Sequence, residues 1–216
     1  MHEPVVFRVE DKAELVAFIR AFPLGLLVAP RGRDGFFVSA DLVPFVIDDH
    51  GTILRAHVAA ANPLCATLAA PHEVLVVFQG PQAYVSPAHY PSKHAHGRVV
   101  PTWNYAMVQV EGLAQRRHGG EWKAEQVAAL TEQMEKERPA PWKVGDAPEA
   151  FVAAQLRAIT GLEIEIAALK GKYKLSQNRD DADRKGVIAG LAAEASPASR
   201  ALARFMAAAK EPVIRG

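Results

Sequence analysis

The sequence has one cysteine, almost no net charge and no long apolar run. Cys65 has no partner for an intramolecular disulfide, which fits a reducing compartment. Its flanking residues, Leu64 and Ala66, favour a packed thiol, because a reactive thiol needs an electropositive setting. The 25 basic and 24 acidic residues nearly cancel. The chain therefore lacks the overall positive charge that is typical of nucleic-acid-binding domains.

No apolar run approaches the ~20 residues that a membrane-spanning helix needs. The N-terminus has neither the cationic nor the apolar region of a signal peptide. We therefore expect a cytoplasmic protein. Half of the 216 residues are hydrophobic, which is enough to form a core. The length allows one domain with a helical appendage.

The first half of the chain predicts one helix and then a series of short strands. The helix covers about residues 11–22, where apolar residues repeat at helical spacing between Asp11 and Pro23. β-rich runs separated by turn residues then occupy about residues 23–112, which is typical of an antiparallel barrel or sandwich. Turns are predicted at Asp34-Gly35 and Gly80-Pro81. The predicted strands are Leu24–Ala29, Phe36–Ala40, Val43–Ile47, Thr52–Ala56, Glu73–Phe78, Ala83–Ser86 and Met107–Gly112.

The second half changes to helical periodicity over about residues 121–160 and 180–210, and Ser196-Pro197 is typical of a helix start. Between them Leu162, Ile164 and Ile166 alternate with glutamates, which predicts a half-buried strand over about residues 162–168 that returns to the barrel. We expect one α+β domain over residues 1–216. The inward-facing residues predicted for the first of these helices, Glu121–Arg138, are Trp122, Val127, Leu130 and Met134.

No strong metal or nucleophile motif is present. His89, His94 and His96 share one segment, but zinc sites use three or four ligands and no second Cys or His cluster completes the set. A solvated loop with unrelated histidines is the favoured interpretation. The glycine-rich and serine motifs of P-loop, Rossmann and α/β-hydrolase proteins are absent. We therefore predict no metal site and assign no catalytic residue.

Four strings combine hydrogen-bond donors with aromatic or cationic residues. They are Ala56-His57-Val58-Ala59-Ala60-Ala61-Asn62-Pro63, the segment from Gly80 to Lys93, Val99-Val100-Pro101-Thr102-Trp103-Asn104-Tyr105, and Lys172-Tyr173-Lys174-Leu175-Ser176-Gln177-Asn178-Arg179. These strings resemble the PaiB family of FMN-binding negative transcriptional regulators. That family belongs to the FMN-binding split-barrel group, together with pyridoxamine-phosphate oxidases and flavin reductases. The resemblance implies an antiparallel split β-barrel with peripheral and C-terminal helices, and a homodimer with FMN at the subunit interface.

FMN needs cations and hydroxyl or amide donors for its phosphate, and an apolar or aromatic surface for its ring. The resemblance implies His57 near the flavin and Trp103 against the ring. The other cofactor-binding candidates are Asn62, Ser86, Lys93, Thr102, Asn104, Lys174, Ser176 and Gln177. Structural roles compete with these assignments, because Trp103 could be core or dimer interface, Lys174 solvated, His57 bonded to a carbonyl, and residues 176–178 a turn cap. Ala60 departs from the family strings, which commonly carry a basic residue there, so one plausible phosphate partner is lost.

Three functions follow from these observations. The first is an FMN-binding regulator, although no helix-turn-helix is visible. Acidic neighbours offset the basic C-terminal residues that could contact DNA, which are Arg179, Arg184, Lys185, Arg200, Arg204 and Lys210. The second is an FMN-dependent oxidoreductase acting on a small molecule, resembling flavin reductases or pyridoxamine-phosphate oxidases. The third is a dimeric interaction module that binds no flavin.

Overall fold

The computed structural model describes residues 1–31 and 37–209, which group into two compact units. Within these residues we call 11–78 and 108–169 the barrel unit, and 1–10, 79–107 and 170–209 the terminal unit. Each unit is described by itself. The predicted Asp34-Gly35 turn, Phe36 and Lys210 lie outside the described residues. The single domain over residues 1–216 stays a prediction.

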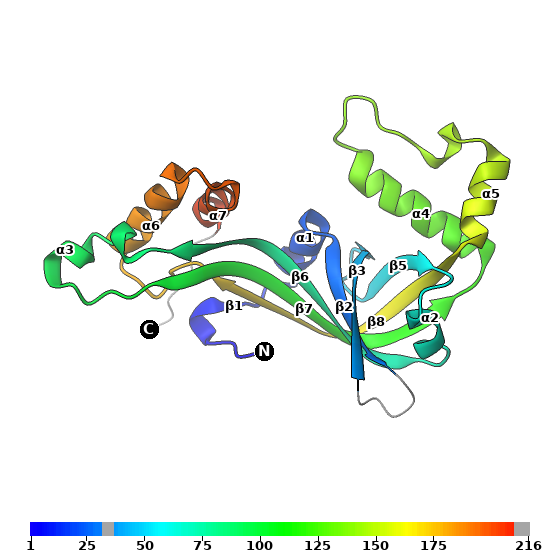
Figure 1. Ribbon diagram of the computed structural model, residues 1–216, viewed down its shortest axis with the longest axis horizontal. Coiled ribbons are helices and arrows are strands. Elements are labelled where there is room, and N and C mark those ends of the chain that lie inside the picture. The colour runs from blue at the N-terminus through cyan, green and yellow to red at the C-terminus, as the bar shows by residue number, and fades with distance from the viewer. Residues whose placement is uncertain (32–36, 210–216) are drawn as a thin grey trace. The chain divides into compact units, whose positions relative to one another are not determined.

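The strands form an eight-stranded sheet in the order β3-β2-β6-β7-β8-β5-β4, and β1 also pairs with β8 (Figure 1). Three strands, β6, β7 and β8, contribute residues to both units. The sheet and the helices around it confirm the predicted α+β class. The bounds are β1 Arg8–Val9, β2 Leu24–Arg31, β3 Phe37–Pro44, β4 Val46–Ile47, β5 Ile53–Ala59, β6 His72–Val85, β7 Thr102–Arg117 and β8 Ile159–Lys174.

The core of the barrel unit follows from the alternation of side chains along its strands. On β5, Leu54 and Ala56 are fully buried, and they lie opposite Ile164 and Leu162 of β8 in an antiparallel register. Side chains directly opposite in such a pair share one face of the sheet, so these four form a continuous apolar layer. Strand β8 is longer than the predicted 162–168 because its pairing begins at Ile159.

Helix α1 (Lys12–Ala21) confirms the first predicted helix. The Asp11 carboxylate accepts a hydrogen bond from the Ala13 N–H, which satisfies one of the free donors of the first turn. The helix buries an apolar stripe in the barrel unit, and four residues make up this stripe: Leu15, Val16, Phe18 and Ile19.

The other helices of the barrel unit are α2 (Leu64–Thr67), α4 (Gly120–Glu135) and α5 (Glu149–Arg157), with a 3-10 turn at Val144–Asp146. Helix α4 differs from its prediction in which side chains face inward. Met134 is 51% exposed, whereas Gln126 is buried. The apolar stripe of α4 therefore does not extend to its last turn, and a polar residue occupies the buried position.

The terminal unit places two helices against its part of the sheet. Helices α6 (Asp181–Ala193) and α7 (Pro197–Ala208) lie side by side (Figure 1). Phe205 of α7 packs edge-on against Tyr173 of β8, with ring centroids 5.4 Å apart. As predicted, α7 begins at Pro197 after Ser196, whose hydroxyl accepts from the Ser199 N–H.

Two predictions for β6 and the segment that follows it were wrong. The runs 73–78 and 83–85 belong to one strand, β6, which continues through Gly80-Pro81 instead of turning there, and Ser86 follows its end. The segment that contains His89, His94 and His96 is not a plain loop, because it forms a 3-10 turn at Pro87–His89 and helix α3 at Ser92–His96. Across residues 1–31 and 37–209, no helix is both long and apolar enough to cross a membrane.

Candidate functional site

The ten residues predicted to bind a cofactor fall into two groups. His57 and Asn62 belong to the barrel unit, and the other eight belong to the terminal unit. In the terminal unit the strings that carry them come together on β6, β7, β8 and the turn after β8.

One face of the terminal-unit sheet packs against α6 and α7, and the other carries half-exposed aromatic and cationic side chains. Asn104 and Ala106 of β7 point to the packed side, where both are buried. Their neighbours alternate to the opposite side, because successive strand residues point to opposite faces. We call this opposite side the outer face; its residues are Gln82 and Tyr84 of β6, Trp103 and Tyr105 of β7, and Lys172 and Lys174 of β8.

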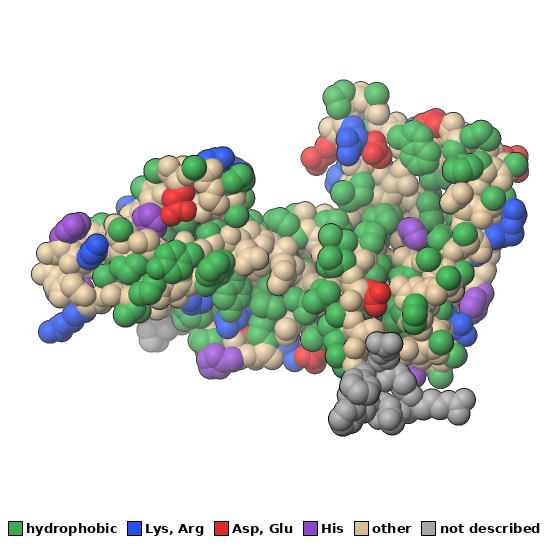
Figure 2. All heavy atoms as spheres, in the orientation of Figure 1, with side chains coloured by type: hydrophobic (Ala, Val, Ile, Leu, Met, Phe, Trp, Pro, Cys, Tyr) green, Lys and Arg blue, Asp and Glu red, His purple; other side chains and the backbone are tan. Residues whose placement is uncertain are grey.

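The aromatic residues of the outer face hold one another in place. Trp103 and Tyr84 are 49% and 48% exposed, and their rings meet edge-on with centroids 6.3 Å apart. The Trp103 indole N–H donates to the Gln82 side-chain oxygen at 3.0 Å. Figure 2 shows hydrophobic side chains gathered over the terminal-unit parts of β6 and β7. Trp103 is therefore neither core nor a freely moving surface residue.

Lys174 brings a cation to the edge of this aromatic group. Its ammonium donates to the Thr102 hydroxyl and, at 2.7 Å, to the Trp103 carbonyl oxygen. Partial burial lowers the pKa of Lys174, and the positive charges of Lys172 and Arg179 lower it further. Three cations thus raise the local positive potential, which favours an anionic group.

Asn104 and Ser176 form a buried polar pair beneath the outer face. The Asn104 amide donates to the Ser176 hydroxyl at 2.8 Å and to the Met206 sulfur at 3.8 Å. Ser176 has a φ of +65°, in the left-handed region. Asn104 Oδ1 is buried without a partner among the described residues. The pair anchors the turn after β8 to β7 and α7.

Three further predicted residues make local contacts. The Gln177 amide accepts from the Leu175 N–H at 2.6 Å and donates to the Tyr173 carbonyl at 2.5 Å, so it closes the turn. The Ser86 hydroxyl caps the 3-10 turn at 87–89. Lys93 is exposed on α3. A ligand role for each of these three stays a prediction.

In the barrel unit, Asn62 and His57 both have protein partners. The Asn62 side chain accepts from the Leu64 N–H at the start of α2 and donates to Asp41 at 3.2 Å. The His57 Nδ1 lies 2.6 Å from Oε1 of Gln126 on α4. Among the described residues the partner of His57 is thus a side-chain amide, whereas the competing interpretation from the sequence was a bond to a neighbouring carbonyl.

A charged cluster beside His57 was missed by the sequence reasoning. Glu163 of β8 is 8% exposed and accepts from Arg117 and from the Trp122 indole, with Arg55 at 3.5 Å. The Arg55 guanidinium also lies 5.8 Å from the Trp122 ring centre. The alternation of β8 marked Glu163 as facing away from the core, but nothing in the sequence indicated that α4 covers that face.

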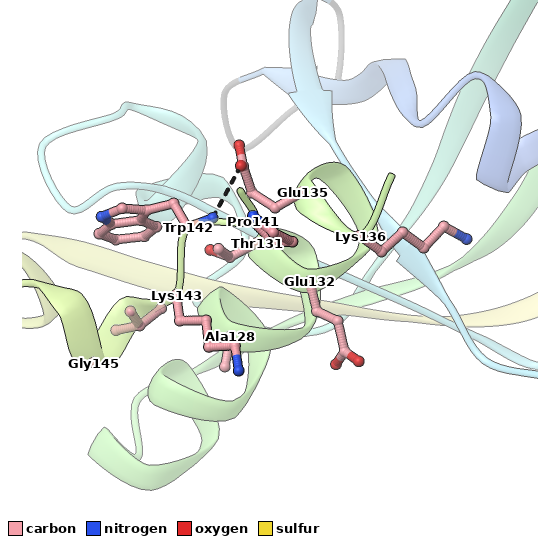
Figure 3. Close-up of a pocket in the computed structure, with 10 residues that line it drawn as sticks. Ala128, Thr131, Glu132, Glu135, Lys136, Pro141, Trp142, Lys143 and Gly145 are labelled. Atoms are coloured by element: carbon pink, nitrogen blue, oxygen red, sulfur yellow. Dashed lines mark hydrogen bonds between the residues drawn. The ribbon is translucent and has the colours of Figure 1, made fainter. Parts of the chain in front are cut away.

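The barrel unit also contains a pocket of about 420 Å³, which contains none of the ten predicted residues. It lies between α4 and the segment 141–145, and the Trp142 N–H bonds to Glu135 at its rim (Figure 3). Its lining residues are Ala128, Thr131, Glu132, Glu135, Lys136, Pro141, Trp142, Lys143, Val144 and Gly145.

Among the described residues, no group of three or more His, Cys, Asp or Glu side chains is arranged to hold a metal ion. The histidines of the 89–96 segment make separate contacts. His89 pairs with Glu194 at 2.9 Å, and His96 Nδ1 accepts from the Arg98 N–H.

Comparisons with known proteins agree with the fold and the motifs. The family model described as "Putative FMN-binding domain" matches residues 1–168. The Bacillus subtilis "Protease synthase and sporulation protein PAI 2" is 32% identical over 206 residues, covering 95% of this chain and 96% of that protein. An uncharacterised protein of Aspergillus fumigatus is 34% identical over 222 residues, covering 82% and 85%.

Solved structures with this fold are more distant in sequence. A protein described as FAD- and heme-binding, from Mycobacterium smegmatis, has a TM-score of 0.58 and 19% identity over 85% of this chain and 80% of its own. A Bacteroides thetaiotaomicron protein described as a putative 5-nitroimidazole antibiotic resistance protein has a TM-score of 0.56 and 13% identity, covering 80% and 93%. These similarities show the fold alone. The chain belongs to the PaiB family, and its fold is the α+β split barrel of the FMN-binding group.

Proposed function

We propose that the protein binds FMN as a homodimer, with the flavin at the subunit interface, and that it acts in the cytoplasm as a negative regulator of transcription. The observation that carries the FMN proposal is the outer face. It combines a fixed, half-exposed indole with a lysine whose neighbouring charges are positive. A flavin needs this combination, because its ring is flat and apolar and its phosphate is anionic.

The chain has Ala60 where the family strings commonly carry a basic residue, so one plausible phosphate partner is missing. Ala60 is exposed, and its N–H donates to the Ala158 carbonyl at the end of β5. Phosphate binding would then rely on Lys174, with Lys172 and Arg179 adding positive potential. We therefore expect FMN to bind, but more weakly than in a relative with a basic residue at this position.

A homodimer would explain why large aromatic side chains remain half-exposed on a flat sheet face. Contiguous exposed apolar patches of this kind typically mark interaction sites. The same face could contact the ring of FMN and the second subunit, as the split-barrel group implies. The mass in solution should then be near twice the chain mass of 23.4 kDa.

The proposed regulatory role rests on family membership, and the basic C-terminal residues give little support for direct DNA contact. Arg179 stacks on the Tyr90 ring, Arg184 donates to the Met206 carbonyl, and Arg200 donates to two carbonyls. These guanidinium groups bind the protein itself, which limits their reach toward phosphates. A band shift that weakens steeply with salt would support direct binding, and no shift with any promoter fragment would contradict it.

FMN titration of the purified protein, followed by flavin absorbance and fluorescence, tests the main proposal. Saturable binding is expected, and replacing Trp103 with leucine should weaken it about five- to tenfold, since a stacking contact contributes about 1–1.5 kcal/mol. Trp142→Leu is the matched control, because that indole is 47% exposed and lies outside the predicted site. A protein that stays colourless at high FMN concentration would refute the proposal and favour the flavin-free interaction module.

The same sample separates regulator from oxidoreductase. Bleaching of the bound flavin by NADPH would favour the alternative function as an FMN-dependent oxidoreductase, whereas a stable oxidised flavin under excess NADPH would argue against it. Light scattering after size exclusion tests the dimer, and a monomer at all protein concentrations would contradict it.

A further inference from the structure

His57 is held on a face of the barrel unit that helix α4 covers. Along β5, Leu54, Ala56 and Val58 point into the core, so Arg55 and His57 point to the opposite face. Gly161 of β8 lies directly opposite His57 in the register. A Cβ at Gly161 would lie 2.2 Å from the Trp122 ring, so the missing side chain lets α4 approach the sheet.

Gln126 lies one turn after Trp122 on this face of α4, and it is 1% exposed. Its Oε1 lies 2.6 Å from His57 Nδ1. Its Nε2 is buried and has no partner among the described residues. Burying the amide nitrogen without a hydrogen-bond partner costs free energy, and a leucine at this position would avoid that cost. The bond to His57 is therefore the one polar contact that accounts for a glutamine here.

The chemistry of the two groups determines which imidazole nitrogen carries the proton. An amide oxygen only accepts hydrogen bonds, so the Nδ1 of a neutral His57 must be the N–H. Nε2 is then unprotonated and can only accept. Nε2 has no hydrogen bond to any described residue, and it is not among the side-chain atoms that are buried without a partner.

The charges around His57 are already paired with other groups. Glu163 is neutralised by Arg117 and Arg55, and Lys123 donates to the carbonyls of Leu156 and Ile159. Among the described residues, the hydrogen-bond partner of His57 is the uncharged Gln126. The Gln126 amide is therefore the described group that can set the orientation of the ring and the position of its proton.

We infer that Gln126 is a positioning residue that holds neutral His57 as the Nδ1–H tautomer and so presents Nε2 to a ligand as a hydrogen-bond acceptor. The ligand group that donates a hydrogen bond to Nε2 is then an N–H or an O–H. FMN carries such donors in the imide N–H of its ring and in the hydroxyls of its ribityl chain. His57 belongs to the barrel unit and the outer face to the terminal unit, so a contact between His57 and FMN is a separate proposal from the contacts of the outer face. This last step rests on the proposed function, whereas the tautomer does not.

The tautomer can be measured directly by nitrogen-15 NMR of the histidine rings, because protonated and bare ring nitrogens have well-separated shifts. The signal of His57 is assigned by its loss in His57→Asn. The wild type should show an Nδ1–H ring without FMN. Gln126→Leu removes the acceptor oxygen and should move most of the ring to the Nε2–H form.

FMN affinity then tests the contact. Gln126→Leu should weaken FMN binding about three- to tenfold, which corresponds to the loss of one hydrogen bond. Gln133→Leu is the matched control on the same helix, because among the described residues its side chain makes a single, long bond of 3.5 Å to the Phe45 carbonyl. It should change neither the His57 signal nor the affinity.

The outcomes separate the inference from the proposed function. A wild-type His57 in the Nε2–H form, or one unchanged by Gln126→Leu, overturns the positioning role whether or not FMN binds. An Nδ1–H ring with unaltered FMN affinity in Gln126→Leu overturns the acceptor contact while FMN binding stands. An Nδ1–H ring that shifts in Gln126→Leu, in a protein that binds no FMN, supports the positioning role and refutes the proposed function.

Discussion

Asp183 joins helix α6 to the short helix α3 through two hydrogen bonds, and its replacement measures how firmly these parts of the terminal unit hold together. Its carboxylate accepts from the Ser92 N–H at 3.0 Å and from the Ser92 hydroxyl at 2.7 Å. Asp183 is 3% exposed, so neither bond is readily replaced by water. A hydrogen bond to a charged group contributes about 1.5–3 kcal/mol.

Asp183→Ala should therefore lower the free energy of unfolding by about 2–4 kcal/mol, since Ser92 is half-buried and partly regains water. Urea unfolding followed by circular dichroism gives the value. Asp181→Ala is the matched control, because it removes a carboxylate from the same first turn of α6. Asp181 is 65% exposed and pairs only with the exposed Lys185, so its loss should cost about 0.3–0.5 kcal/mol.

Equal losses in the two alanine variants would refute the reasoning, because the difference between them isolates the contact with Ser92 from the general effect of a carboxylate near a helix start. Ser92→Ala refines the test. Combined with Asp183→Ala, it should show a coupling of about 1 kcal/mol or more in a double-mutant cycle, whereas independent effects would contradict a direct bond.

The same carboxylate predicts a dependence of stability on pH. Burial raises the pKa of Asp183, but the hydrogen bonds from Ser92 and the charges of Arg179 and His96 outweigh it and leave the pKa below its usual 3.8. Because the pKa is lower in the folded protein, the unfolded chain binds this proton at a higher pH than the folded protein does. The stabilisation is thus complete above about pH 4 and is lost as the pH falls through the lowered value. Asp183→Ala should therefore show a smaller fall in unfolding free energy as the pH decreases below about 4 than the wild type shows.

Two further predictions follow from close contacts elsewhere. Gly190→Ala should lower the free energy of unfolding by about 1–3 kcal/mol, because the new Cβ would lie 2.1 Å from the His89 ring. Gly145→Ala is the control. A Cβ there would meet no atom within 4 Å, so the free energy of unfolding should change by less than about 0.5 kcal/mol. Asp48→Asn should weaken the acid dependence of thermal unfolding. Burial raises the pKa of Asp48, but hydrogen bonds led by the Thr52 hydroxyl lower it overall. The stabilisation by this carboxylate is therefore lost as the pH falls below about 3.8. An unchanged dependence of thermal unfolding on acid pH in Asp48→Asn would contradict this.

The local elements of this fold could be predicted because their signals are local. Asp11 caps α1 and Ser196 caps α7 within one turn of chain. The alternation of apolar residues in β5 and β8 predicts two strands whose buried faces then meet in the register. The Gly80-Pro81 prediction failed because the described register between β2 and β6 ends at Phe78. Beyond Phe78, β6 has no described pairing with β2 on that side. Pro81 has no N–H to donate, but no hydrogen bond to β2 is required there, so the strand continues.

The sequence could predict only those candidate site residues whose signal lies within one short string of the chain. Trp103 and Lys174 were singled out because an aromatic and a cation in a short string suggest a ligand, and their role in binding stays a prediction. Gln126 was not, because its partner His57 lies 69 residues away and the bond forms only when α4 covers β5. Glu163 escaped notice for the same reason, since a glutamate on an alternating strand is typical of a solvated face.

Ser176 limits how freely this chain can be redesigned. Glycine is the usual choice at a φ of +65°, and it would relieve roughly 1 kcal/mol of backbone strain. It would also remove the hydroxyl that accepts from Asn104 and leave the nitrogen of that buried amide with only the weak sulfur acceptor of Met206, at about 1–3 kcal/mol. The two effects oppose each other, and the larger one favours serine. A sequence-design method that scores only backbone conformation would therefore choose the wrong residue at this turn.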